Sequence, residues 1–307
     1  MRFFHCKSIL AILTIASATL CPAFAYEEDL TPREITTSSG VTYSLYPQGN
    51  LKFDFVTSRP ATKKSNILFC IPAAFTTPSN RVDGICISNG EPASASVVNK
   101  NLGGAVVIDR GDCKFFPTDK GLKLTSVLLK DVQKKRASLF QQFLLVHEGR
   151  AATFKDKTKF QRRAICQFDK SFGVIESDKA IDFATFNSDL VEIGAKEALY
   201  CDMGAWDEGW YRPSPDSKIV KIGKDRSLTA RQSNWLLLRK ADEDSTATAP
   251  KVTKKPGAKK TAESETPTAT KAAESKTRST TKAAEFKTPG AKKTAESKTP
   301  ASKNLKK

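Results

Sequence analysis

Carboxylates and aromatic side chains follow a short apolar segment late in the hydrophobic part of the chain. Residues 198–201 predict a buried strand, and Asp202 lies where that strand opens into a loop. Asp207 stands further along the loop, between Trp206 and Trp210. Glycoside cleavage generally uses carboxylates beside the scissile bond, and aromatic rings commonly line ligand sites. The loop is therefore a candidate carbohydrate site, while core-covering rings and a structural Asp cap fit the same pattern.

Arg163 is the candidate cation for a phosphate group. It precedes a predicted hairpin with strands at 164–168 and 173–176. An arginine side chain matches two phosphate oxygens with parallel N–H donors. Because successive side chains of a strand point to opposite faces, we expect either Arg162 or Arg163 to be exposed. We predict that Arg163 holds a phosphate in the same pocket where Asp202 acts as acid, base or hydroxyl ligand.

The elements that must position these residues are mostly strands. Residues 26–240 predict an α+β domain that is rich in mixed or antiparallel sheet, with a few flanking helices. Apolar spacing indicates a helix within 125–143, and Asp182 and Gly194 are suited to cap a helix at 183–193. We expect strands 41–45 and 51–56 to pair with each other, and further strands at 66–71, 105–109, 114–116, 143–147 and 151–154.

The two ends of the chain differ from this middle part. Residues 1–25 read as a secretory signal, with Arg2 and Lys7 before an apolar run and a small-x-small site ending at Ala25. Residues 241–307 repeat Lys, Ala, Thr, Ser, Glu and Pro, with 16 Lys and Arg against 8 Asp and Glu. We expect this tail to be disordered, because it has too little apolar surface to offset its ordering entropy. The predicted location is periplasmic, cell-surface or extracellular.

Composition excludes several classes of protein and site. The chain has 307 residues and a formal net charge of +17, and no apolar run approaches the roughly 20 residues of a transmembrane helix. His147 is the one histidine after the predicted signal, so a multi-histidine metal site is excluded and no metal ligands are assigned. Five cysteines follow the signal, so disulfides and buried free thiols both stay open.

Several motifs, in order, resemble the phosphodiester glycosidase domain family. The longest runs from Arg162 to Gly204 and ends in ALYCDMG. An upstream block, IPAAFTTPSNRVDGICISNGEP, looks like the family's "I-N-G-G-F" segment and the turn that follows it. The segments GGAVVIDRGD and FLLVHEGR fall where the family has its next strands. The resemblance covers roughly residues 35–215 and implies the family's fold.

The resemblance also implies site residues and an activity. It keeps Arg163 and Asp202 as catalytic candidates and Phe75 and Gly204 as substrate-binding candidates, beside Trp206, Asp207 and Trp210 from the loop. Pro72 stands where the family has Asn, and it has neither a side-chain amide nor a backbone N–H.

Two functions of different class therefore stay open. The first is an exported hydrolase of a sugar phosphodiester in envelope or extracellular glycans. The second is a non-catalytic exported protein that binds glycan, with a tail that adheres to an anionic surface or polymer. The tail also resembles linker-histone tails, but a secretory signal argues against nucleic acid as the partner. No cofactor is assigned.

Overall fold

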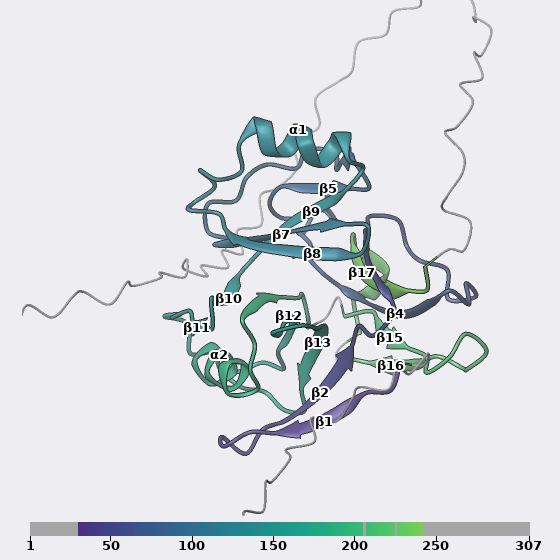
Figure 1. Ribbon diagram of the computed structural model, residues 1–307, viewed down its shortest axis with the longest axis vertical. Helices are drawn as coiled ribbons and strands as arrows, with labels where there is room; N and C mark the ends of the chain where they lie inside the picture. Colours follow the sequence, from purple (N-terminus) through teal and green to yellow (C-terminus); the bar gives the residue numbers. More distant parts are fainter. Residues whose placement is uncertain (1–29, 205–206, 225, 242–307) are drawn as a thin grey trace, which may run out of the picture.

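The computed structural model describes residues 30–204, 207–224 and 226–241. They form three antiparallel sheets and two α-helices (Figure 1), which confirms the expected sheet-rich α+β class. In these residues no helix is both long and apolar enough to cross a membrane. The predicted signal at 1–25 and all of the predicted tail after Ala241 lie outside the described residues.

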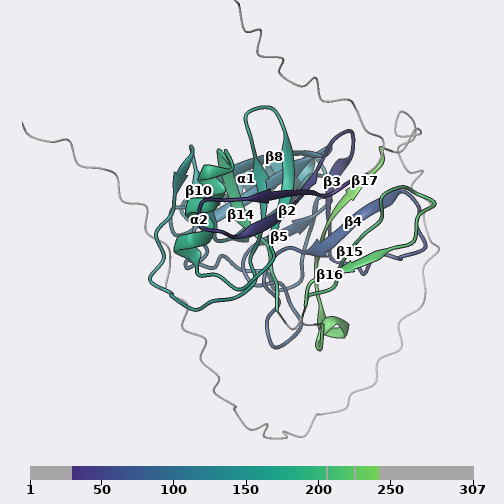
Figure 2. The same ribbon diagram turned by 90° about the horizontal axis from the view of Figure 1, so that it is seen from below.

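The first sheet has seven strands in the order β1-β2-β13-β12-β14-β10-β11. Its central strands are buried on both faces, by two separate core clusters. Helix α2 (Phe183–Glu192) packs beside β10, as Figures 1 and 2 both show. The strands are β1 (Arg33–Thr36), β2 (Thr42–Pro47), β10 (Leu144–His147), β11 (Arg150–Ala151), β12 (Arg163–Gln167), β13 (Phe172–Ser177) and β14 (Glu197–Tyr200).

The second sheet has five strands in the order β16-β15-β4-β17-β3. Strand β4 is buried along its whole length, as its continuous apolar sequence predicts. A short 3₁₀ helix, Thr229–Arg231, leads into β17. The strands are β3 (Lys52–Val56), β4 (Ile67–Pro72), β15 (Gly209–Tyr211), β16 (Val220–Ile222) and β17 (Trp235–Arg239).

The third sheet has five strands in the order β6-β5-β9-β7-β8, and α1 (Ser126–Lys134) lies over it (Figure 1). Val132 of α1 is buried in the cluster between this helix and the sheet. The strands are β5 (Cys86–Ser88), β6 (Glu91–Pro92), β7 (Gly104–Asp109), β8 (Asp112–Pro117) and β9 (Ser138–Gln142).

Three sequence-based expectations about these elements are wrong. The strand expected at 151–154 is only the two-residue strand β11, Arg150–Ala151. The segments 41–45 and 51–56 do form strands, but β2 pairs with β1 and β13 while β3 pairs with β17. The helix expected within 125–143 ends at Lys134, and its second half is strand β9. Arg136 ends the helix by adopting a left-handed backbone, with φ +55°, although it is not a glycine. The sequence therefore carries no glycine signal for this helix end.

The other helix follows its sequence signals closely. The Asp182 side chain accepts a hydrogen bond from the Thr185 amide at 2.9 Å and caps α2 as expected. Gly194, with φ +99°, follows the C-cap residue Ile193.

All five cysteines after the predicted signal are buried free thiols, so the structure has buried apolar thiols where disulfides were the alternative.

Candidate functional site

Asp202 lies where three segments from two sheets meet. Its backbone N–H donates to the Ala73 carbonyl at 2.9 Å, which joins the end of β14 to the segment after β4. The Thr76 hydroxyl of that segment is 2.9 Å from the Ser233 hydroxyl, just before β17. These contacts bring the ends of β14 and β4 and the start of β17 together, and we call this junction the Asp202 site.

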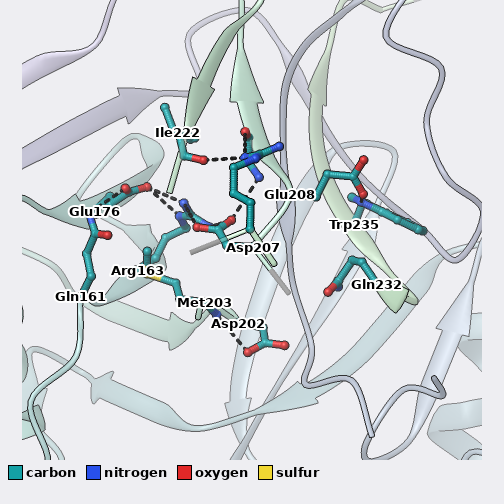
Figure 3. Close-up of polar contacts among 12 residues, drawn as sticks. Gln161, Arg163, Glu176, Asp202, Met203, Asp207, Glu208, Ile222, Gln232 and Trp235 are labelled. Atoms are coloured by element: carbon teal, nitrogen blue, oxygen red, sulfur yellow. Dashed lines mark hydrogen bonds and ion pairs between the residues drawn. The ribbon is translucent and has the colours of Figure 1, made fainter. Parts of the chain in front are cut away.

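The Asp202 carboxyl is nearly buried, with 6% of the residue exposed. Burial raises its pKa to about 7, because a carboxylate in a poorly hydrated place loses solvation. The negative charge of Asp207 raises the pKa further, whereas Arg163 and the backbone amides of Met203 and Thr76 lower it. The Met203 N–H donates to Asp202 Oδ1 at 2.9 Å and holds the side chain in place (Figure 3).

Arg163 is fully buried, and its guanidinium contacts two carboxylates. Its Nε and Nη2 donate to Glu176 Oε2 at 2.9 and 2.5 Å, and its Nη1 and Nη2 donate to Asp207 at 3.0 and 3.1 Å (Figure 3). Burial alone would lower the pKa of Arg163, but Asp207 and Glu176 hold it above its ordinary value. We call Glu176, Arg163 and Asp207 the buried ion triad.

Glycines shape the space around the buried ion triad. A Cβ on Gly223 would lie 1.8 Å from Asp207 Oδ2, so no larger residue fits there unless the carboxylate moves. The Gly209 N–H donates to Asp207 Oδ1 at 3.0 Å. The loop after Asp202 is therefore tied to the first sheet through Asp207 and Arg163.

The two predicted catalytic residues have different surroundings. Strands β12 and β14 are neighbours, and the Cys201 N–H donates to the Arg163 carbonyl at 3.0 Å, so the two residues come from adjacent strands as expected. Arg163 has no exposed surface, and neither Arg163 nor Asp202 lines the cleft described below. A pocket shared by these two side chains stays a prediction.

The expectation that one of the two arginines is exposed is wrong, because Arg162 is also buried. The Arg162 guanidinium lies 3.8 Å over the Phe183 ring of α2, and its Nε donates to the Ile181 carbonyl at 3.1 Å. A strand covered on both faces leaves neither side chain in solvent. Aromatic faces and carbonyls stabilise the Arg162 cation there.

The predicted substrate-binding residues differ in how deeply they are buried. Phe75 is half-buried and packs edge-on against Phe143, with ring centroids 5.4 Å apart, and Trp210 is buried with Trp235 in a core cluster. Gly204 is exposed, has φ +93°, and no atom of the described residues lies within 4 Å of the position of a Cβ. Trp206 lies outside the described residues. Asp207 belongs to the buried ion triad.

Asn234 and Gln232 are polar residues of the Asp202 site that sequence reasoning missed. Asn234 is fully buried, accepts from the Ala74 N–H at 2.7 Å and donates to the Ala74 carbonyl at 2.9 Å. Pro72, next to this segment, ends β4 opposite Trp235. The Gln232 Oε1 atom is buried and has no hydrogen-bond partner among the described residues. No sequence motif marks this segment.

Glu176 could have been found from the sequence. The turn at Asp169-Lys170 sets a register in which Arg163 lies directly opposite Glu176. Opposite charges at such a position commonly pair.

His147 is half-buried and has Nδ1 2.9 Å from Glu197 Oε2, at another end of the first sheet. In the described part of the chain, no three His, Cys, Asp or Glu side chains gather to hold a metal ion.

Comparisons with known proteins give a distant structural similarity to a glycosidase domain. The catalytic domain of zebrafish N-acetylglucosamine-1-phosphodiester alpha-N-acetylglucosaminidase, auto-inhibited by its pro-peptide, matches at 12% identity and a TM-score of 0.46. That match covers 69% of this chain and 82% of the zebrafish domain. A hypothetical protein from Synechocystis matches at 12% identity and a TM-score of 0.45, over 68% of this chain and 61% of that one. No protein-family model and no curated protein matches the sequence.

Proposed function

We propose that the chain is an exported hydrolase that cleaves a sugar from a phosphodiester in envelope or extracellular glycans. The resemblance of residues 35–215 to the phosphodiester glycosidase domain family supports this substrate class, and the signal-like residues 1–25 support export. The observation that carries the proposal is the Asp202 carboxyl, whose pKa is raised to about 7 at the mouth of a loop.

Asp202 is the group that we assign as general acid. A carboxyl with a pKa near the working pH is both protonated and able to give up its proton. As the bond from the anomeric carbon to the bridging oxygen breaks, Asp202 protonates that oxygen, which leaves on a phosphomonoester. Water adds its hydroxyl to the anomeric carbon, and its remaining proton returns to Asp202.

Arg163 is assigned as a positioning residue. Its guanidinium is paired with Glu176 and Asp207, so direct contact with a phosphate would require these ion pairs to open. In the described arrangement it ties the loop that contains Asp207 to the first sheet, and its charge lowers the pKa of Asp202. Arg163 therefore lowers the pKa of Asp202 without contacting the substrate.

Contacts to the sugar are assigned to the residues around the loop. The unpartnered Gln232 Oε1 suits a sugar hydroxyl, which is a hydrogen-bond donor. Among the described residues nothing fills the position of a Cβ on Gly204, and Trp206 is the candidate ring for stacking on a sugar face. Trp210 packs in the core and is not assigned to substrate.

The test is release of reducing sugar from a synthetic aryl ester of a sugar 1-phosphate. D202N is expected to lower kcat/KM at least 100-fold, because general acid catalysis typically contributes that much. The wild-type rate should fall as the pH rises above about 7, where Asp202 loses its proton. D169N is the matched control, because Asp169 is an exposed carboxylate in a turn, with 80% of its side chain exposed. Equal turnover by D202N and D169N would contradict the proposal.

A glycan-binding function without turnover is the second candidate, and Pro72 favours it. This residue ends β4 within the Asp202 site and replaces an amide side chain by a ring that cannot hydrogen-bond. If the wild type binds a sugar phosphodiester but releases no sugar, the binding function replaces the hydrolase. The basic tail would then add weak, salt-sensitive adhesion to anionic surfaces.

A further inference from the structure

A cleft of about 350 Å³ lies between the second and third sheets, and Asp202 does not line it. It lies among the start of β3, the turn between β7 and β8, the end of α1 and the end of β17. Its lining carries five cationic side chains and two carboxylates, so positive charge is in excess. The cations are Lys52, Arg110, Lys135, Arg136 and Arg239, and the carboxylates are Asp54 and Asp109. We call this the cationic cleft.

Existing ion pairs neutralise only part of this charge. Arg239 Nε donates to Asp54 Oδ2 at 3.0 Å, and Arg110 Nε donates to Asp109 Oδ1 at 3.3 Å. Lys135 Nζ lies 2.7 Å from Asp131 Oδ2, so this cation is paired as well. The Arg110 side chain is 90% exposed, so its ion pair is weak and opens readily. Within the described ranges, no carboxylate forms an ion pair with Arg136. The cleft therefore keeps an excess of positive charge that attracts an anion from solvent.

Arg110 has an unfavourable backbone for its residue type. It is the first central residue of the two-residue turn between β7 and β8 and has φ +52°. Such turns strongly favour Asn-Gly or Asp-Gly, because both central residues need positive φ. The neighbouring turn between β5 and β6 has this preferred pair, Asn89-Gly90. At Arg110 the chain places a cation where Asn would be more stable.

Arg136 repeats this pattern at a helix end. The Arg136 N–H donates to the Gln133 carbonyl and the Ala137 N–H to the Val132 carbonyl, a Schellman motif whose left-handed residue is usually glycine. Helix α2 ends in the same motif with Gly194. A left-handed backbone is unfavourable for a residue with a side chain larger than that of glycine. Strain of this kind gathers at functional sites, and here two strained cations face one cleft.

The segments that carry these cations are packed tightly against one another. A Cβ on Gly90 would lie 2.8 Å from the Gln133 carbonyl oxygen and 3.0 Å from Arg136 Cα. A Cβ on Gly111 would lie 2.4 Å from Lys52 Cδ. The β5–β6 turn is thus pressed onto the end of α1, and the β7–β8 turn onto Lys52. This packing fixes the backbone from which Arg110 and Arg136 extend before any ligand binds.

We infer that the cationic cleft binds phosphate groups of an anionic polymer. Arginine side chains match phosphate oxygens better than lysine does, because their donors form a planar fork. Ala241 also lines the cleft; the acidic residues 242–244 follow it in the sequence, and the Lys-rich repeats begin at Lys251. A long anionic polymer can therefore contact both the cleft and these Lys-rich repeats. This site is separate from the Asp202 site.

The test measures binding of sodium tripolyphosphate to the full chain by titration calorimetry at low salt. R110N and R136N together are expected to weaken binding at least 10-fold, since each removes a charge-assisted contact. Asn tolerates the left-handed backbone, so both variants should be at least as stable as the wild type. K120N is the matched control, because Lys120 is exposed, has φ +51° and does not line the cleft. It should change the affinity less than 2-fold.

The alternative outcomes overturn the inference. If the double variant binds as tightly as the wild type, the phosphate is held by the tail and the cleft is not a site. R110N alone is measured as well, because it removes one charge as K120N does. If K120N weakens binding as much as R110N alone, net charge alone attracts the anion. Long-chain polyphosphate and inorganic phosphate extend the test, and a polymer site requires the chain form to bind more tightly per molecule.

Discussion

Arg163 and Arg136 carry the same guanidinium in opposite surroundings. Arg163 has no exposed surface and contacts the carboxylates of Glu176 and Asp207. Arg136 is exposed at the rim of the cationic cleft and has φ +55°. An unpaired charge in the interior costs several kcal/mol, whereas solvent stabilises an unpaired charge at the surface. A buried motif arginine therefore stabilises the fold, and a surface arginine with an unfavourable backbone is the better candidate for ligand contact.

Removal of the buried cation is the largest effect that this contrast predicts. R163M leaves Glu176 and Asp207 buried without their partner, and we expect the free energy of unfolding to fall by about 3–5 kcal/mol. R136M removes the same charge from the surface and should change it by less than about 0.5 kcal/mol. Urea denaturation at pH 7 measures both.

A second variant keeps this prediction testable if R163M does not fold. R163M combined with E176Q and D207N removes the whole buried ion triad, and it should recover much of the lost stability because no buried charge stays unpaired. A loss below about 1 kcal/mol in R163M alone would show that the triad is not truly buried.

The next effect in size is expected at Asp202, and it depends on pH. The folded-state pKa of about 7 lies above the ordinary value of 3.8. Between these values the folded state holds a proton that the unfolded state has released, so stability falls as the pH rises and the loss is complete above about 7. D202N carries no charge and should exceed the wild type by roughly 4 kcal/mol at pH 8, with a smaller difference at pH 4. Lower stability of D202N at pH 8 would identify Asp202 as a structural cap.

The smallest effect tests the backbone of the cationic cleft. Helices α1 and α2 end in the same motif, with Arg136 in one and Gly194 in the other. R136G should raise the free energy of unfolding by up to about 1 kcal/mol, and G194R should lower it by a similar amount. A Cβ at Gly194 meets no atom of the described ranges within 4 Å, so that change reports mainly the backbone. Thermal unfolding of the two variants measures the difference, and equal stabilities would remove the strain argument for Arg136.

Local elements of the fold could be predicted from the sequence, and long-range pairings could not. The hairpin β12–β13 and the capped helix α2 follow from periodicity, a turn signal and caps within a few residues. The pairing of β3 with β17 joins residues almost 200 positions apart, and no local signal encodes it. Helix α1 was extended too far because Arg136 ends it where glycine is usual.

The candidate site divides in the same way. Asp202 at a strand end was predictable from a buried run followed by a loop, and Glu176 opposite Arg163 follows from the hairpin register. The contact of Asp207 with Arg163 and the bonds of Asn234 to Ala74 depend on how separate sheets meet. Sequence spacing therefore indicated Asp202 as a candidate but assigned Arg163 to the ligand without its buried partners.

The most direct test of the account is the titration of the Asp202 carboxyl itself. Carbon-13 NMR of aspartate-labelled protein follows each carboxyl signal with pH, and the signal that is absent in D202N belongs to Asp202. The account predicts a midpoint near pH 7, as a general acid requires. A midpoint near its ordinary value of about 4 would show an ordinary carboxylate and contradict both the burial argument and the proposed hydrolase.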